Sequence, residues 1–373
     1  MSALTRNASR VTALTASLAV LAAGALTLAP ASSAATGDIT EFALAAGTAP
    51  NDVAAGPDGN LWVANSGNNT VSKVSTSGAV VATYTMTTAN ASPWAITAGP
   101  DGAMWVALRS GNKIAKVTTD GAVTEFAIPT NNSLPFDIAA GSDGALWFTE
   151  FGGNKIGRIT TAGAITEYAI PTAIAGAFGI TPGPTGSSRM YFTESLKNKI
   201  GQVSLTGDVS ETVSVGAGSL PEGIAVINGS VWFAETGTSK LGRLVNDSTV
   251  SEIALGSAPT QIAPGPGDTM WVSSGNSIIA MTNQGGTTGT YTFSNANSQP
   301  RGLTLGADGS MWVALAPPRR ARLRRSVEAQ RPNLSRQRRR SAERRRATRF
   351  SSPRQRLRAL STSPSRRGRR RRL

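Results

Sequence analysis

Seven aromatic residues recur along this chain at intervals of 39 to 44 residues, each a few positions after a turn. Self-similarity with a period near 40 is the sequence signature of a repeat architecture, in which each repeat forms one supersecondary unit. Within each repeat, four short apolar segments are separated by turn residues, a pattern typical of β-strands. The pattern predicts an all-β fold, a seven-bladed β-propeller with four-stranded blades. The recurring residues are Trp62, Trp105, Trp147, Tyr191, Trp232, Trp271 and Trp312.

The first repeat shows where the strands begin and end. We predict strands near residues 52–56, 61–66, 70–75 and 79–86, with Asp58-Gly59 turning the chain between the first two. Asp-Gly pairs permit the positive φ angles that tight hairpins need. The aromatic residue lies on the second strand beside apolar neighbours, so we expect it to pack between adjacent blades. An acidic residue recurs on the outermost strands, where we expect solvated edge charges; these residues are Glu41, Glu125, Glu167, Glu211 and Glu252.

Residues 1–35 have the pattern of a secretory signal peptide. Arg6 and Arg10 precede an apolar Ala/Leu-rich run over residues 11–29, and small residues follow up to position 35. This order favours a cleaved signal over a membrane anchor, and cleavage before Ala35 or before Thr36 fits equally well. The chain contains no cysteine, so it has no disulfide framework. We predict a secreted, extracellular protein that is a monomer and is free of the membrane after cleavage.

The net charge of +15 is distributed unevenly. Residues 36–316, the predicted propeller, hold 12 basic and 20 acidic residues, whereas residues 317–373 hold 23 arginines and two acids. A block of like charge is typical of an arm that binds nucleic acid or another polyanion. This one has no lysine, and Phe350 is its only aromatic residue for base stacking, which makes nucleic acid an unfavoured partner. We expect a disordered tail or a segment read out of frame, with a polyanion-binding arm as the alternative.

The Arg-rich segment begins in the middle of the seventh repeat. The first strand of that repeat is predicted near residues 302–306 and the second near 311–315, after which the sequence changes to Pro317-Pro318-Arg319-Arg320. Residues 39–44 match the fourth strands of other repeats, so we expect the start of the propeller to close the ring. The last blade is therefore predicted to be incomplete, with a first, a second and a fourth strand only.

At one position the residue type differs from repeat to repeat, although the positions around it are nearly constant. It follows the proline that opens the innermost strand, with Ala177 replacing that proline in the fourth repeat. Innermost strands line the central channel of a propeller, so these residues are expected to ring its mouth and bind a ligand. The alternative is that the aromatic members only fill the channel. The seven residues are Asn51, Trp94, Phe136, Phe178, Glu222, Thr260 and Arg301.

A second position lies three residues after each recurring aromatic residue. Three adjacent repeats carry glutamate there, at Glu150, Glu194 and Glu235. Carboxylates gathered around one channel would raise one another's pKa or bind a hard divalent cation such as Mg²⁺ or Ca²⁺. We predict these three as metal ligands, with a solvated rim as the alternative. The same position holds Asn65, Leu108, Ser274 and Leu315 in the other repeats.

Two local motifs resemble the streptogramin B lyase (virginiamycin B lyase) family. They are W-F-T-E at residues 147–150 with N-K-I-G-R-I at 154–159, and Y-F-T-E at 191–194 with N-K-I-G at 198–201. The resemblance covers residues 38–316. It implies a propeller that opens cyclic depsipeptide antibiotics by Mg²⁺-assisted β-elimination. In that family a histidine after the inner-strand proline is the base, and a glutamate at the W-x-x-E position of the same blade helps to hold the metal.

This chain contains no histidine. At the position that matches the family's histidine, Glu222 is the nearest substitute, and Glu235 is the W-x-x-E residue of the same repeat. We therefore predict binding of a small cyclic peptide or lactone at the channel mouth, with Glu222 as the base and Mg²⁺ as the cofactor of a carbon–oxygen lyase. The alternative function is a secreted propeller that binds a ligand or partner without catalysis.

Overall fold

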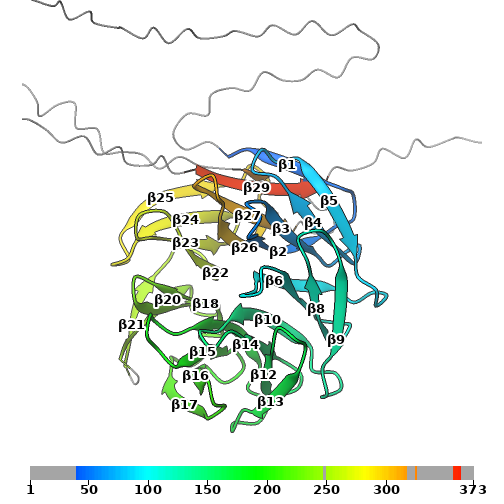
Figure 1. The fold of residues 1–373 in the computed structure, drawn as a ribbon. Helices are drawn as coiled ribbons and strands as arrows, with labels where there is room; N and C mark the ends of the chain where they lie inside the picture. The colour runs from blue at the N-terminus through cyan, green and yellow to red at the C-terminus, as the bar shows by residue number, and fades with distance from the viewer. Residues whose placement is uncertain (1–38, 247–248, 317–323, 326–355, 363–373) are drawn as a thin grey trace, which may run out of the picture. The chain divides into compact units, whose positions relative to one another are not determined.

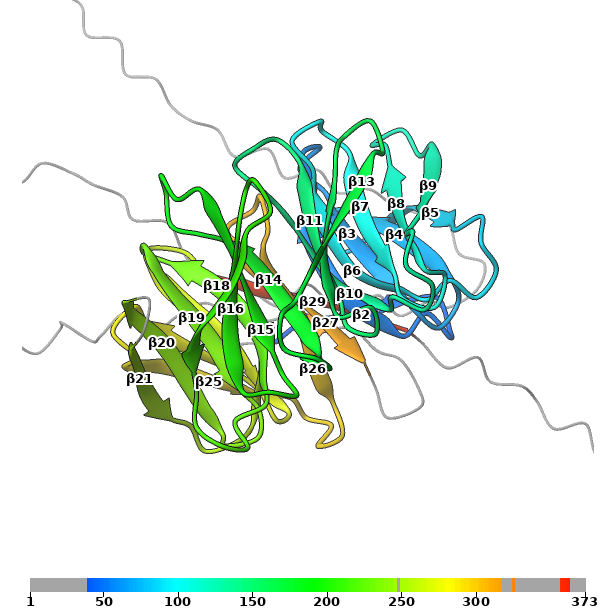
Figure 2. The same ribbon diagram turned by 90° about the horizontal axis from the view of Figure 1, so that it is seen from below.

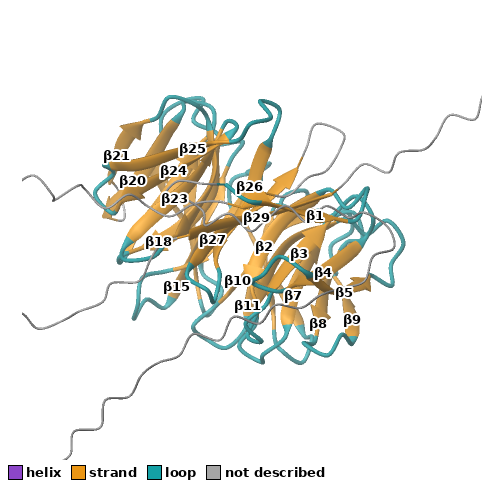
Figure 3. Cartoon of the chain, turned by 90° about the horizontal axis from the view of Figure 1, so that it is seen from above, coloured by secondary structure: helices purple, strands orange, loops and turns teal. Residues whose placement is uncertain are grey.

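The structure, a computed structural model, describes residues 39–246, 249–316, 324–325 and 356–362. Its regular elements are all β-strands, joined by turns and loops (Figure 3). The predicted signal peptide of residues 1–35 and most of the Arg-rich segment lie outside the described residues. In the part that is described, no helix is long and apolar enough to cross a membrane.

Six blades are regular antiparallel sheets of four strands each, in chain order from the inside outward. Blade 1 comprises β2 (Pro50–Ala55), β3 (Leu61–Asn65), β4 (Thr70–Val74) and β5 (Val80–Thr85). Blade 2 comprises β6 (Pro93–Ala98), β7 (Met104–Leu108), β8 (Lys113–Val117) and β9 (Val123–Ala127). Blade 3 comprises β10 (Pro135–Ala140), β11 (Leu146–Glu150), β12 (Lys155–Ile159) and β13 (Ile165–Ala169).

The next three blades repeat this order. Blade 4 comprises β14 (Ala177–Pro182), β15 (Arg189–Glu194), β16 (Lys199–Ser204) and β17 (Val209–Ser214). Blade 5 comprises β18 (Pro221–Ile227), β19 (Ser230–Glu235), β20 (Lys240–Asn246) and β21 (Thr249–Ala254). Blade 6 comprises β22 (Pro259–Pro264), β23 (Thr269–Ser274), β24 (Ser277–Thr282) and β25 (Thr287–Thr292). Figure 2 shows β18, β19, β20 and β21 following one another outward in one sheet.

The innermost strands form a closed ring. Each inner strand contacts the inner strands of the two neighbouring blades, and β26 (Gln299–Leu305) of the last blade contacts β2 of the first (Figure 1). The predicted all-β, seven-bladed propeller is confirmed. The strands predicted for the first repeat agree with the observed ones to within about two residues at each end.

The seventh blade is irregular, as the sequence predicts. Its sheet has the order β1 (Glu41–Leu44), β29 (Arg356–Thr362), β27 (Ser310–Ala316) and β26, with the short β28 (Arg324–Arg325) also paired with β27. The N-terminal strand β1 therefore closes the ring from outside. The place of the antiparallel third strand is taken by β29, which runs parallel to both β1 and β27. The sequence did not predict this strand, because the residues that form it share nothing with the repeats.

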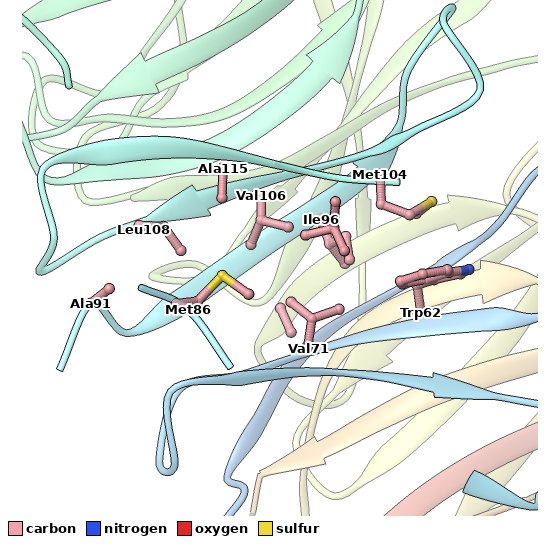
Figure 4. Packing of buried hydrophobic residues seen from close by; sticks show 11 residues of the cluster. Trp62, Val71, Met86, Ala91, Ile96, Met104, Val106, Leu108 and Ala115 are labelled. Atoms are coloured by element: carbon pink, nitrogen blue, oxygen red, sulfur yellow. The ribbon is translucent and has the colours of Figure 1, made fainter. Parts of the chain in front are cut away.

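The recurring tryptophans pack between neighbouring blades, as expected. Trp62 of blade 1 is fully buried and belongs to one cluster with Ile96, Met104 and Val106 of blade 2 (Figure 4). A similar cluster joins Trp312 of β27 to blade 1, so apolar packing also closes the ring. Burial of a large apolar side chain contributes about 1.5–3 kcal/mol, and each blade junction contains several.

The prediction of solvated edge glutamates is wrong for the middle blades. The side chain of Glu125 is only 3% exposed. Its carboxylate accepts hydrogen bonds from the backbone N–H and the hydroxyl of Thr88, and it pairs with Lys113 at 3.1 Å. Glu167 and Glu211 make the equivalent contacts in the next two blades. These carboxylates therefore fasten a loop of the preceding blade, a contact that a single repeat cannot reveal.

Candidate functional site

A cavity of about 590 Å³ lies among the first residues of the innermost strands. All seven residues predicted to ring the channel mouth line it, so strands from seven blades contribute side chains to one site. The lining residues are Asn51, Asp52, Trp94, Ala95, Arg109, Phe136, Asp137, Phe178, Glu222, Ala258, Thr260, Gln261, Gly275, Gln299, Pro300 and Arg301.

A break in strand register positions the mouth residues. In all seven blades the pairing of the first and second strands shifts directly after the opening residue, for example between Pro135 and Ile138 in blade 3. β-Bulges of this kind re-aim the side chains near them. The repeated proline, which has no backbone N–H to donate, sits where the regular ladder ends. The bulge therefore frees the next residue to face the channel.

Three aromatic side chains from consecutive blades form one wall of the cavity. The ring of Trp94 meets Phe136 edge-on at 5.1 Å between centroids, and Phe136 meets Phe178 at 4.0 Å. Phe151, in the turn directly after the second strand of blade 3, has its ring centroid 5.7 Å from that of Phe136. All four rings are only partly buried. The wall is thus an apolar surface that another flat group can cover.

Two arginines lie over the start of this wall. The guanidinium carbon of Arg109 is 4.5 Å from the ring centroid of Trp94, and that of Arg301 is 5.4 Å from the same ring. Arg301 also donates a hydrogen bond to Oδ1 of Asn51 at 2.9 Å. Burial lowers the pKa of both arginines, and for Arg301 the effect of Glu222 opposes this while that of Arg109 adds to it. Both charges are therefore partly desolvated.

Glu222 faces the same cavity from blade 5. Burial raises the pKa of its carboxyl, while the hydroxyl of Thr236 and the charge of Arg301 act in the opposite direction. A carboxylate with a raised pKa is a stronger base when it is ionised. Of the predicted catalytic and metal residues, Glu222 is the one that the cavity contains.

Two aspartates in the cavity wall were not predicted. Asp52 accepts hydrogen bonds from the backbone N–H groups of Val53 and Ile96, and Asp137 accepts them from Ile138 and Ile180. Each carboxylate therefore bridges two neighbouring inner strands. Burial raises the pKa of Asp52 to about 8 and that of Asp137 to about 6, against the effect of these hydrogen bonds. A signal was present in the sequence, since aspartate occurs at this position in only two repeats.

The structure does not bring Glu150, Glu194 and Glu235 together. Each is fully buried inside its own blade, and none of them lines the cavity. Among the described residues there is no group of three or more Asp, Glu, His or Cys side chains that could hold a metal ion. Their full burial also excludes the solvated rim. Glu150, Glu194 and Glu235 therefore do not fit a shared Mg²⁺ site in the described part of the chain.

These three glutamates are the partners of the residues that open the inner strands: Pro135 pairs with Glu150, Ala177 with Glu194 and Pro221 with Glu235. Burial raises the pKa of all three, to about 8 for Glu150 and Glu194. The neighbouring carboxylates of Glu167 and Glu211 raise the pKa of Glu150 and of Glu194 further. In two other blades the residue one position further along the repeat lines the cavity, namely Arg109 in blade 2 and Gly275 in blade 6.

Comparison with known proteins identifies the family. The family model described as the virginiamycin B lyase family matches residues 31–228 and 183–317. The chain belongs to the virginiamycin B lyase family. A sequence comparison with curated proteins gave no match.

Solved structures of virginiamycin B lyases superpose on most of this chain. A streptogramin B lyase structure is 29% identical, with a TM-score of 0.71, and the match covers 76% of this chain and 96% of that one. Virginiamycin B lyase from Staphylococcus aureus is 29% identical, with a TM-score of 0.70, over 75% of this chain and 96% of that chain. A catalytically inactive variant of the S. aureus enzyme, with alanine in place of a histidine, is 28% identical over 75% and 96% of the two chains, with a TM-score of 0.69, and was solved with quinupristin.

Proposed function

We propose that this protein binds a small cyclic peptide or lactone with an aromatic ring in the cavity at the channel mouth. One observation carries the proposal: Trp94, Phe136 and Phe178 form a continuous wall, and the same cavity holds Arg301 and Glu222. Ligand sites are typically concave and mostly apolar, with a few polar groups that fix orientation. The volume of about 590 Å³ falls in the range of small-molecule sites.

The family supports this ligand class. A related lyase was solved with quinupristin, and that relative matches this chain over three quarters of its length. Quinupristin is therefore the first ligand to test. We also propose that the protein acts outside the cell, on the basis of its predicted signal peptide.

Calorimetric titration of quinupristin into the purified protein tests the proposal. We expect saturable binding by the native protein. Trp94→Ala should weaken it about tenfold, since truncation of an aromatic anchor typically costs more than about 1 kcal/mol. Tyr84→Ala is the matched control, because Tyr84 stacks on Trp62 in the body of blade 1 and does not line the cavity. Absence of saturable binding by the native protein would remove the proposal.

A second candidate function is opening of the bound lactone by β-elimination. Glu222 supports it, because its carboxyl lies in the cavity with a raised pKa. In this reaction the carboxylate of Glu222 takes a proton from the ligand, at the carbon next to the carbonyl of the residue that carries the ester. The electron pair of that C–H bond forms a C=C double bond to the neighbouring carbon. The C–O bond on that neighbouring carbon breaks, and the former ester group of the ligand leaves as a carboxylate. The described residues do not fit a metal site, so no step of the proposal passes through a metal ion.

Mass spectrometry separates this reaction from hydrolysis, because elimination opens the ring without adding a water molecule. We expect a linear product of unchanged mass and no loss of turnover in a chelator. Glu222→Gln should abolish turnover while quinupristin still binds. Binding by the native protein without any ring opening would contradict the elimination reaction and would support a propeller that binds its ligand without catalysis.

A further inference from the structure

The proposal above assigns no particular ligand group to three polar side chains at one edge of the cavity. They are Arg109, Arg301 and Asn51, which come from the second, last and first blades. We propose that they form a subsite for a carboxylate carried by the ligand beside its aromatic ring. The inference rests on the proposed function, since it names the group that binds next to the aromatic wall.

The two arginines are partly buried, yet they lack the ion-pair partners that such arginines normally have. Across the described ranges, neither Arg109 nor Arg301 takes part in an ion pair. A guanidinium group has five N–H donors. Arg301 donates to Asn51, and Nε of Arg109 is buried with no partner in the described part of the chain. Most of the donors of this pair therefore have no partner within the described residues.

Asn51 is a second and independent indication. Its side chain is only 7% exposed and lines the cavity, yet its Nδ2 atom has no hydrogen-bond partner among the described residues. Its Oδ1 accepts from Arg301, which fixes the orientation of the amide. A buried donor without a partner destabilises the structure, because nothing compensates for its lost contact with water. A ligand oxygen at this edge of the cavity would satisfy it.

The carboxylates of the cavity do not fill this role. Both oxygens of Asp52 and of Asp137 accept backbone N–H groups, which holds them against the inner strands. Glu222 acts on Arg301 through its charge but makes no ion pair with it in the described structure. The positive edge of the cavity therefore lacks a contacting counter-charge.

The geometry favours a planar carboxylate attached to an aromatic ligand. Guanidinium groups bind carboxylates through paired N–H bonds, which are stronger than hydrogen bonds between neutral groups. Trp94 holds both arginines by cation–π contact and continues into the Phe136–Phe178 wall. One ligand can thus place its anionic group over Trp94 and its ring against the wall.

Two small probes of nearly the same shape test the subsite: N-acetylphenylalanine, which is an anion, and its neutral amide. We expect the native protein to bind the acid about tenfold more tightly than the amide, since hydrogen bonds to a charged group are stronger than those between neutral groups. Arg109→Gln should remove most of this preference, and Asn51→Ala part of it. Arg158→Gln is the matched control, because Arg158 stacks on Trp147 and pairs with Asp143 outside the cavity. Thermal melting of each variant confirms that it is folded.

The outcomes separate this inference from the proposed function. Equal binding of acid and amide would overturn the carboxylate subsite, and saturable binding of quinupristin would still support the proposed function. Binding of the acid without binding of quinupristin would support the carboxylate subsite and contradict the proposal that the ligand is a cyclic peptide. An acid preference that survives Arg109→Gln and Arg301→Gln would assign the anion to other residues and overturn the inference.

Discussion

The indole N–H of Trp62 donates a hydrogen bond to Oδ1 of Asp58, 3.1 Å away. Asp58 belongs to the Asp-Gly turn of blade 1, and its other oxygen pairs with Lys73 at 2.6 Å. The same arrangement joins Trp105 to Asp101 and Trp147 to Asp143. The turn residue, the buried aromatic residue and the basic residue of the third strand thus form one unit, which explains why all three recur in the sequence.

Blade 5 lacks this unit. Asn228 stands four residues before Trp232, but its φ is 46°, and it begins a tight turn of two residues with positive φ. Nε1 of Trp232 is buried without a partner among the described residues. We therefore expect Trp62→Phe to lower the free energy of unfolding by about 1 kcal/mol more than Trp232→Phe, because only the first loses a hydrogen bond. Urea unfolding of both variants measures the difference, and equal losses would contradict the assignment.

Glu150 should make the protein less stable as pH rises. Burial, and then the charge of Glu167, raise the pKa of its carboxyl to about 8 from the ordinary value of 4.5. The folded state therefore retains a proton that the unfolded state loses, and stability falls between about pH 4.5 and 8. Glu150→Gln carries no titrating group, so its melting temperature relative to the native protein should increase over this range. A constant difference between pH 5 and pH 8.5 would contradict the prediction.

Glu125 should have the opposite effect at acid pH. Burial alone would raise its pKa, but hydrogen bonds from Thr88 and Lys113 outweigh burial and lower the pKa to about 2. The carboxylate therefore stabilises the fold above about pH 4.5, and this contribution is lost as pH falls toward 2. Glu125→Gln should lower the melting temperature at pH 7. Near pH 2 the melting temperature of the variant should approach that of the native protein. Glu252→Gln is the control, since the side chain of Glu252 is 31% exposed and should matter less.

The repeat pattern predicted the architecture because each blade carries its own strand and turn signals. It also predicted the mouth residues, since variation at Trp94, Phe136 and Phe178 stands out against constant neighbours. The W-x-x-E glutamates could not be placed correctly, because one residue along a strand decides which side the side chain faces. Glu150 therefore lies inside its blade, whereas Arg109, one position further in its own repeat, reaches the cavity.

Contacts between blades could not be predicted from the sequence of a single repeat. Asp52 bridges to the backbone of Ile96 in the next blade, and Glu125 holds Thr88 in the preceding one. Neither partner is adjacent in sequence, and neither contact repeats in all seven blades. The parallel strand β29 was also unpredicted, because its pairing depends on the edges that β1 and β27 leave open rather than on a motif.

Truncation after Ala316 tests the role of β29. Residues 41–44 pair with residues 359–362, and β27 pairs with β29 on its outer side. Removal of residues 317–373 would leave both strands with unpaired backbone groups and separate β1 from its sheet. At about 2–4 °C for each kcal/mol lost, we expect the melting temperature to fall by roughly 5–10 °C. Deletion of residues 363–373 alone removes arginines but keeps β29, so it should leave the melting temperature nearly unchanged. Equal melting temperatures for the native and truncated proteins would show that β29 does not contribute to closing the ring.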